Sequence, residues 1–406
     1  MIVNIIKYGV SEGLAKIAPF LTTLYVAKFL SPELFGRYSL VIVLFEIIFI
    51  LISFNIQSTT RIDFFKENHF NFCKIKQNHI VISFLFASVA LLSLVFLDGE
   101  NKLIVFFLIM SALLRTISVF ALAIFQCSKK VNLYIWANTI FVFSLALSVF
   151  IFVNLGATYY SWAVSMVIAS ALQLLFVLKA FGLKSFKAYW PRDVTYKSLK
   201  IAFVPAFLFM PQAIGWWLKN GADRFLINDF LGTEVLGNYS LAFQLSSILI
   251  IFVATVNLAL VPTVNESLKN KKIDVVIRML FIMALSCVLF NVLLYYTTLE
   301  VLDLFYQESY PLAKEMTLYL CIANLFQAFN MIYINVLYYE NEGGVVAKVI
   351  FFSFVCQLFV NFQLLYFFDK GVIDLIISSA VFNLLVLAIL LLRTRRVIAS
   401  YRGLYV

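Results

Sequence analysis

FLSPELFGRYSL, at residues 29–40, and FLGTEVLGNYSL, at residues 230–241, agree at seven of twelve positions. The second copy begins about half a chain length after the first, in a chain of 406 residues. Weak internal similarity at such an offset is typical of proteins built from two related halves. The pair therefore predicts a duplicated architecture, and the rest of the sequence shows what kind.

The composition places both halves in a membrane. The chain is 63% hydrophobic and 13% charged, with a mean hydropathy of +0.97, whereas a soluble domain carries about 25% charged residues. Most of its surface must therefore face lipid. The net charge of +10 is explained by basic loop ends, and no basic soluble domain suggests binding to nucleic acid.

Twelve apolar stretches are each long enough to cross a bilayer, which takes about 20 residues. They are expected at 5–29, 38–60, 79–97, 103–127, 131–153, 159–180, 200–229, 236–262, 276–299, 314–338, 346–368 and 372–392. Because six is an even number, both halves enter the membrane in the same orientation and form a parallel repeat. The prediction is an all-α polytopic membrane protein with a six-helix lobe at 1–181, a linker at 182–199, and a second lobe with a basic tail at 200–406.

The basic residues set the orientation. With both termini and the even-numbered loops on one side, that side holds 22 of the 31 Lys and Arg residues. Such an excess marks the cytoplasmic face, so both termini are predicted to be cytoplasmic. The first apolar stretch is too long for a cleavable signal peptide, and no A-x-A site follows it.

On this topology, each copy of the repeat forms the outward link between the first two helices of its half, which we call an elbow. Gly36 and Gly237 would permit a close backbone approach or a positive φ. Tyr38 and Tyr239 are expected at the membrane interface, where aromatic residues are favoured. The elbows therefore predict architecture more than chemistry.

Candidate site residues are the ionisable groups inside predicted membrane helices, where a charge costs roughly 2.5–3.5 kcal/mol at the bilayer centre. The cations suit a phosphate or diphosphate head group, and the candidates for binding it are Lys16, Arg115, Lys219, Arg224 and Arg61. The acids are candidates for gating, or for coupling to a proton or sodium gradient, and they are Glu12, Glu46 and Asp223. Prolines and glycines are expected to break the seventh helix beside a cavity, at Pro205, Pro211, Gly215 and Gly221.

A structural interpretation of the same charges stays open. Buried ion pairs would join Glu12 to Lys16, Glu46 to Arg115, and Asp223 to Lys219 or Arg224. The last two cations could also reach the outer interface through their long side chains. A position at the cytoplasmic end of the second helix would make Arg61 a topology anchor.

The sequence lacks the residue patterns that several kinds of functional site require. The five cysteines include no CxxC, and the two histidines, His69 and His79, fall in a polar stretch expected to be a solvated loop; neither pattern predicts a metal site. No G-x-x-x-x-G-K-[ST] motif for nucleotides is present. No long loop carries a catalytic constellation, so the chain is expected to be neither an ATPase nor another enzyme, and to need no cofactor.

The elbow motifs carry a family resemblance. VAKFLSPELFGRYSLVIVLFEIIFILISFNIQSTTRIDFFKE resembles the N-terminal signature of polysaccharide-export flippases, whose link reads lGp-x-x-fG-x-Y, with an Arg near the end of helix 2 that Arg61 matches. These are the O-antigen (Wzx-type) translocases of the multidrug/oligosaccharidyl-lipid/polysaccharide superfamily. GADRFLINDFLGTEVLGNYSLAFQL resembles their second link at Asp223, Arg224, Gly232, Gly237 and Tyr239. Ser31 stands where the family usually has Gly, and Lys28 where it often has Arg.

The resemblance implies a two-lobed bundle with a central cavity that works by alternating access in the bacterial inner membrane. Its substrate would be an undecaprenyl-diphosphate-linked oligosaccharide, and its partners membrane lipids, a polymerase and other glycan-assembly proteins. A drug/cation antiporter of the same superfamily, a major-facilitator transporter and a membrane-embedded glycan polymerase are the alternatives. The sequence leaves open the sugar, the coupling ion, the resting conformation and the oligomeric state.

Overall fold

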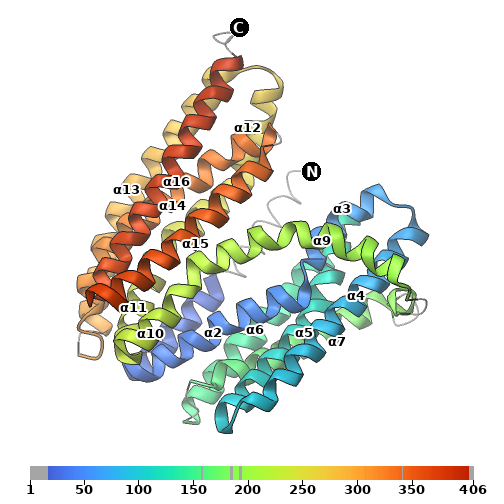
Figure 1. Cartoon of the computed structure of the whole chain (residues 1–406), viewed down its shortest axis with the longest axis horizontal. Coiled ribbons are helices and arrows are strands. Elements are labelled where there is room, and N and C mark those ends of the chain that lie inside the picture. Colours follow the sequence, from blue (N-terminus) through green and yellow to red (C-terminus); the bar gives the residue numbers. More distant parts are fainter. Residues whose placement is uncertain are drawn as a thin grey trace. The chain divides into compact units, whose positions relative to one another are not determined.

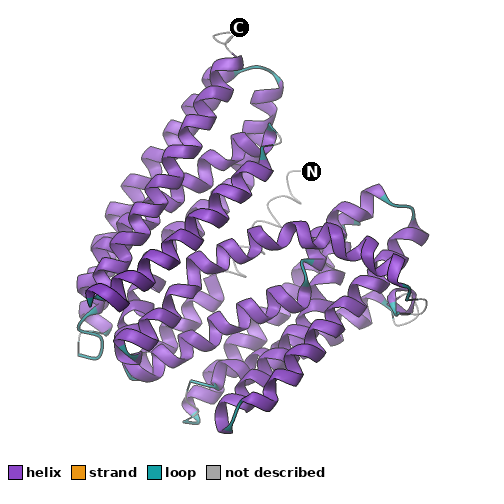
Figure 2. Ribbon diagram, viewed as in Figure 1, coloured by secondary structure: helices purple, strands orange, loops and turns teal. Residues whose placement is uncertain are grey.

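A computed structural model of the chain describes residues 17–156, 159–182, 186–191, 194–306, 308–340 and 342–401. These residues form helices and loops, without a strand among them (Figure 2). Eleven helical segments are long and apolar enough to cross a membrane, and a shorter apolar helix, Ile17–Phe29, is the described end of the predicted first span. The predicted all-α polytopic membrane class is confirmed.

Contacts between residues divide the chain into two compact units. Unit 1 contains the residues up to Thr22 and Tyr38–Trp217, and unit 2 contains Thr23–Arg37 and Leu218–Val406. The limits fall inside helices, whereas the lobe limits expected from the repeat fall at 181 and 200. The difference arises because helix α9 (Tyr196–Trp217) packs against α4 (His69–Leu92) of unit 1 (Figure 1).

Unit 1 is a helical bundle in which α5, α6 and α7 lie side by side (Figure 1). The elements of unit 1, in chain order, are most of α2 (Pro32–Ser53), α3 (Ile56–Lys66), α4, the 3₁₀ turn η1 (Ser93–Phe96), α5 (Gly99–Cys127), α6 (Val131–Asn154), α7 (Ser161–Phe181), η2 (Lys187–Tyr189) and α9. Two residues with positive φ, Phe54 at 46° and Asn55 at 57°, separate α2 from α3. The apolar run of the second predicted span therefore contains a break near the end.

Unit 2 continues from α9 through a π-helical turn, η3 (Leu218–Ala222), into α10 (Asp223–Leu231). Then follow α11 (Thr233–Ser246), α12 (Ile248–Lys269), α13 (Ile273–Phe305), α14 (Ala313–Tyr339), α15 (Gly343–Phe368) and α16 (Val372–Tyr401). Helices α14 and α16 form the tightest pair in the unit. Because π-turns often occur at functional sites, η3 draws attention to its side chains.

Of the four positions expected to break the seventh span, only Gly221 lies in an irregular turn, the π-helical turn η3. Helix α9 continues through both Pro205 and Pro211, and the irregular turn begins only at Leu218. The expectation of breaks at the prolines was wrong. A proline inside a membrane helix is tolerated where small local adjustments satisfy the freed backbone groups.

The two elbows pack against each other inside unit 2. A Cβ atom on Gly36 would collide with the Thr233 carbonyl and lie 3.1 Å from the Gly237 backbone nitrogen. A Cβ atom on Gly237 would collide with the carbonyl of Pro32. Both glycines are therefore required by a backbone crossing, as the close-approach interpretation predicted. The repeated motif places matching small residues on the two sides of one contact.

Two tyrosines hold the chain just before the first elbow. The Tyr310 hydroxyl donates to the carbonyls of Ala27, at 2.8 Å, and Leu30, at 2.9 Å. The Tyr306 hydroxyl donates to the carbonyl of Leu24 at 2.8 Å. The carbonyls of Ala27 and Leu30 lie at the end of the helix, where backbone carbonyls have no partner within it, so the Tyr310 hydroxyl satisfies groups that the helix end leaves open. Burial raises the pKa of Tyr310, which keeps its phenol protonated as the donor.

The elbow tyrosines differ from expectation. Tyr38 is fully buried and Tyr239 is 4% exposed, so neither is an interfacial aromatic with its ring in the head-group layer. The hydroxyl of Tyr239 donates instead to Asp223. A buried phenol needs a hydrogen-bond partner, and in unit 2 that partner is a predicted site residue.

Candidate functional site

The predicted site residues of unit 2 lie together on η3 and α10. Lys219, Asp223 and Arg224 are each less than a tenth exposed. Helix α15 packs against both elements, and the Lys219 Nζ atom lies 5.1 Å from the centre of the Phe354 ring on that helix. The Arg224 guanidinium carbon lies 5.2 Å from the centre of the Phe243 ring. Aromatic faces thus stabilise both cations inside the unit.

Asp223 and Arg224 each have a buried polar atom without a hydrogen-bond partner in the described part of the chain. Asp223 accepts the hydroxyl of Tyr239 at Oδ2, but its Oδ1 atom has no hydrogen-bond partner in the described part of the chain. The Nε atom of Arg224 is likewise buried without such a partner among the described residues. A buried polar group without a partner is costly. Groups of this kind mark where a ligand, an ion or a second conformation would add a bond.

In unit 1, Arg115 ties three helices together. From α5 it donates to the Gln173 side chain on α7, and its guanidinium carbon lies 3.6 Å from the centre of the Phe141 ring on α6. Gln173 in turn donates to the Ala137 carbonyl at 3.0 Å. Arg115 as a whole residue is half-buried.

The other predicted residues are more dispersed. Glu46 lies exposed on α2. Arg61 is exposed in the middle of α3 and donates from Nε to the Gln126 side chain at 2.9 Å. Glu12 and Lys16 lie outside the described residues. The structure therefore groups Lys219 with Asp223 and Arg224, and the remaining assignments stay predictions.

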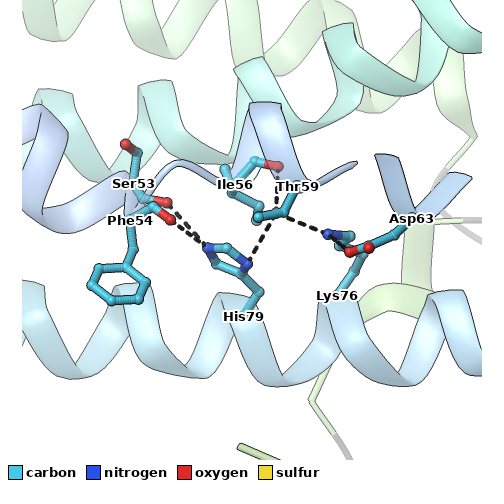
Figure 3. A network of polar contacts seen from close by, with 7 residues as sticks. All are labelled: Ser53, Phe54, Ile56, Thr59, Asp63, Lys76 and His79. Atoms are coloured by element: carbon cyan, nitrogen blue, oxygen red, sulfur yellow. Dashed lines mark hydrogen bonds and ion pairs between the residues drawn. The ribbon is translucent and has the colours of Figure 1, made fainter. Parts of the chain in front are cut away.

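One buried polar cluster was not predicted. Within the stretch expected to be a solvated loop, α3 ends and α4 begins, and His79 is fully buried on α4 (Figure 3). His79 Nε2 lies 3.3 Å from the Ser53 carbonyl and 3.1 Å from the Phe54 carbonyl. Since carbonyls only accept, this nitrogen carries the proton. The expectation of a solvated loop histidine holds for exposed His69 and was wrong for His79, which satisfies carbonyls at the α2–α3 break.

The same cluster contains a buried ion pair. Lys76, fully buried, lies 2.7 Å from Asp63 Oδ2 and 3.0 Å from Thr59 Oγ1 (Figure 3). Thr59 also lies 3.5 Å from His79 Nδ1. The available signal was the polar spacing along α4, where Lys76 and His79 lie three residues apart and so share a helical face.

A second unpredicted feature is a set of buried amides in unit 2. It comprises Asn238, Asn291, Asn324, Gln327, Asn330, Asn335, Gln357, Asn361 and Asn383. Several bond between helices: Asn330 donates to the Asn383 carbonyl at 3.1 Å, and Asn324 to the Ser246 hydroxyl at 3.0 Å. Such bonds join membrane helices. Within the described residues, no group of His, Cys, Asp and Glu is arranged to hold a metal ion.

Comparison with known families decides the classification. A model described as "Polysaccharide biosynthesis protein" matches residues 2–268, well over half of the chain. The chain belongs to this family. A second model, MatE, matches residues 210–363, which include the η3–α10 segment. Both fit the predicted polysaccharide-export (Wzx-type) branch of the superfamily.

Individual relatives agree with this family membership. "Lsg locus putative protein 1" of Haemophilus influenzae (strain ATCC 51907 / DSM 11121 / KW20 / Rd) is 23% identical over 280 residues, which cover 66% of this chain and 67% of that protein. A multidrug resistance MATE family transporter of the MOP superfamily, solved in an inward-facing conformation, gives a TM-score of 0.74 at 13% identity over 96% of both chains.

A MOP superfamily transporter from Pyrococcus furiosus Vc1 (DSM3638), whose structure is described as having a binding pocket of reverse polarity, gives a TM-score of 0.64 at 13% identity. That match covers 98% of this chain and 96% of the solved one. The likeness to these structures establishes the superfamily fold. Family and fold together point to a transporter rather than an enzyme.

Proposed function

We propose that this member of the polysaccharide biosynthesis family is a flippase. It moves an undecaprenyl-diphosphate-linked oligosaccharide, such as an O-antigen or capsule repeat unit, from the cytoplasmic to the outer leaflet of the bacterial inner membrane. The observation that carries the proposal is the family match, combined with cations inside membrane helices. Both termini would be cytoplasmic, and a glycan polymerase would act on the product.

The basic side chains would hold the diphosphate. Arg115 presents a planar guanidinium with one face against Phe141, and a planar fork of donors suits phosphate oxygens. Lys219 and Arg224 would supply further positive charge from unit 2, as Lys16 would from the first helix. The prenyl tail would stay in lipid while alternating access carries the head group and the sugars across.

Asp223 is the candidate for coupling. Its Oδ1 atom, buried and without a hydrogen-bond partner among the described residues, could take up a proton or contact a sodium ion. Glu12 and Glu46 remain further candidates for gating or coupling. In this mechanism the ion gradient would bias the conformation of unit 2 through a group that has a second bonding state.

The charge of Arg115 can be separated from its structural role. In a strain lacking its own flippase, Arg115→Ala is expected to lower surface glycan at least tenfold at equal membrane abundance, because the phosphate contact is lost. Gln173→Leu is the matched control, since it removes the hydrogen-bond partner and keeps the charge. Glycan export that is unchanged in Arg115→Ala, or lowered equally by both variants, would overturn the anion-binding role.

A drug/cation antiporter is the second candidate, and the MatE match and the multidrug transporter structure favour it. An organic cation would call for an acidic site, whereas unit 2 places two cations beside one acid. Efflux of a fluorescent organic cation from cells separates the two functions. Efflux without glycan export would identify the antiporter, and glycan export without efflux would support the flippase.

A further inference from the structure

Two adjoining hollows flank the crossing of α4 and α9 in unit 1. The first is a cavity of about 470 Å³, lined by residues that include Glu67, Lys74, Asn78, Lys197 and Ser198. The second is an apolar groove of about 440 Å³, lined by Ile82, Leu85, Phe86, Val89, Tyr196, Leu199, Lys200 and Phe203. Together they place basic side chains beside an apolar trough.

One turn of α9 contributes a lysine to each hollow. Lys197 lines the cavity and Lys200 lines the groove; residues three apart are neighbours on a helix surface. Both lysines are exposed, as is Lys74. The described part of the chain gives none of the three an ion-pair partner. The cavity also contains the half-buried Glu67, whose carboxylate accepts from the Asn71 side chain at 3.4 Å. Lys200 lines the groove, whose lining residues include no acid.

Aromatic residues mark the membrane level of this turn. Tyr196 is 83% exposed and Trp190 is 52% exposed, with its ring 6.2 Å from that of Phe84 on α4. Exposed Trp and Tyr favour the head-group layer. From Ile82 to Val89 the groove follows α4 for about 10 Å, at ~1.5 Å per residue. The basic residues thus lie at the level of the lipid head groups, and the apolar surface that would contact an acyl chain begins beside them, as the structure of a phospholipid requires.

We propose that this groove binds an anionic phospholipid of the bilayer. Its phosphate would lie between Lys197 and Lys200, and one acyl chain would lie along Leu85, Phe86 and Val89. Basic pockets between membrane helices on the cytoplasmic side bind anionic head groups, and the orientation predicted from the basic residues places this turn there. The proposal concerns a bilayer lipid and does not depend on which substrate the protein transports.

The charge requirement is tested by native mass spectrometry of the detergent-purified full chain titrated with phosphatidylglycerol. Lys197→Gln/Lys200→Gln is expected to weaken the tightest adduct about thirtyfold, from roughly fivefold per basic residue. Lys269→Gln/Lys272→Gln, which removes two exposed lysines from the same predicted side in unit 2, should leave it unchanged. Equal losses in both variants, or equal binding of zwitterionic phosphatidylcholine, would overturn the proposal.

The apolar requirement has its own test. Leu85→Trp and Val89→Trp fill the groove at exposed positions and leave every lysine in place, so each should also weaken the phosphatidylglycerol adduct. Inorganic phosphate at millimolar concentration should not displace the lipid. Full displacement by phosphate, together with unchanged binding in both tryptophan variants, would show an ion site instead of a lipid site.

Discussion

Among the described residues, each unit contains one cluster of buried charged residues, and the two clusters differ in how far their hydrogen bonds are satisfied. In unit 1, Lys76 is 2.7 Å from Asp63 and 3.0 Å from Thr59, and His79 completes the cluster at the α2–α3 break (Figure 3). In unit 2, Asp223 and Arg224 each retain a buried polar atom without a hydrogen-bond partner in the described chain.

The difference separates structure from function. A buried ion pair whose groups are satisfied holds helices in one arrangement, and breaking it exposes the full cost of an unpaired charge. A buried group with an unused bonding position can change partner, as a binding or coupling residue must. We therefore interpret the unit 1 cluster as a structural clamp and the unit 2 cluster as the working site.

The largest loss of stability is expected when the Lys76–Asp63 ion pair of the unit 1 cluster is removed. Lys76→Met leaves Asp63 without its cation, and we expect a loss of about 3–5 kcal/mol in the free energy of unfolding. Lys314→Met is the matched control, since it breaks the exposed Lys314–Asp303 pair and should cost less than about 1 kcal/mol. Both values come from unfolding of the purified protein in detergent. Equal, small losses would show that the buried pair is no clamp.

The unit 1 cluster was not predicted, because the sequence was searched for charged residues only within apolar stretches. The polar run between the second and third predicted spans looked like a loop, because basic, acidic and histidine side chains interrupt its apolar residues. Their pairing depends on the α2–α3 break, where Phe54 and Asn55 adopt positive φ, and nothing in the local sequence specifies that break. The all-α membrane class depended on length and composition, which the sequence carries. Of the twelve expected spans, eleven are helices long enough to cross a membrane within the described residues. The repeat indicated a close backbone approach at Gly36 and Gly237, but not that the two elbows contact each other.

A second, smaller effect is expected at the elbow, the close-packed part of unit 2. Gly237→Ala puts a methyl group against the backbone of Pro32, which cannot move aside as a side chain could. Overpacking of this kind costs about 1–3 kcal/mol. At Gly344 an added Cβ has nothing within 4 Å, so Gly344→Ala is the control and should be neutral or stabilising by up to about 1 kcal/mol.

Thermal unfolding of the two glycine variants tests whether the repeated motif is architectural. If Gly237→Ala unfolds like the wild type, the elbow backbones move apart readily and the motif needs another explanation. A loss of thermal stability in Gly237→Ala alone would show that unit 2 is rigid at the elbow. The polar site on η3 and α10, one short helix earlier in the chain, differs from the elbow because it keeps unused bonding positions.

The site itself was only partly visible in the sequence. Lys219, Asp223 and Arg224 stood out because charges are rare inside membrane helices, and the structure groups them on η3 and α10. The π-turn that positions Lys219 and the ring contacts of both cations were not predictable, because they depend on how α15 and α11 pack around the turn. The buried amides carried a visible signal, since polar residues recur at helical spacing on α14 at Asn324, Gln327 and Asn330.

The smallest change in stability is expected at Asp223, the residue proposed to couple transport to an ion gradient. Asp223→Asn keeps the shape of the side chain and an oxygen that can accept the Tyr239 hydroxyl, so unfolding should shift by less than about 1 kcal/mol. Removing a buried charge that lacks a full set of partners can even stabilise a protein.

Glycan export should nevertheless fall at least tenfold in Asp223→Asn, because an amide can neither take up a proton nor balance the neighbouring cations. Asp303→Asn, at an exposed acid, should leave export intact. Export at the wild-type level in Asp223→Asn would contradict the working-site interpretation, and a stability loss as large as that of Lys76→Met would make the two clusters alike.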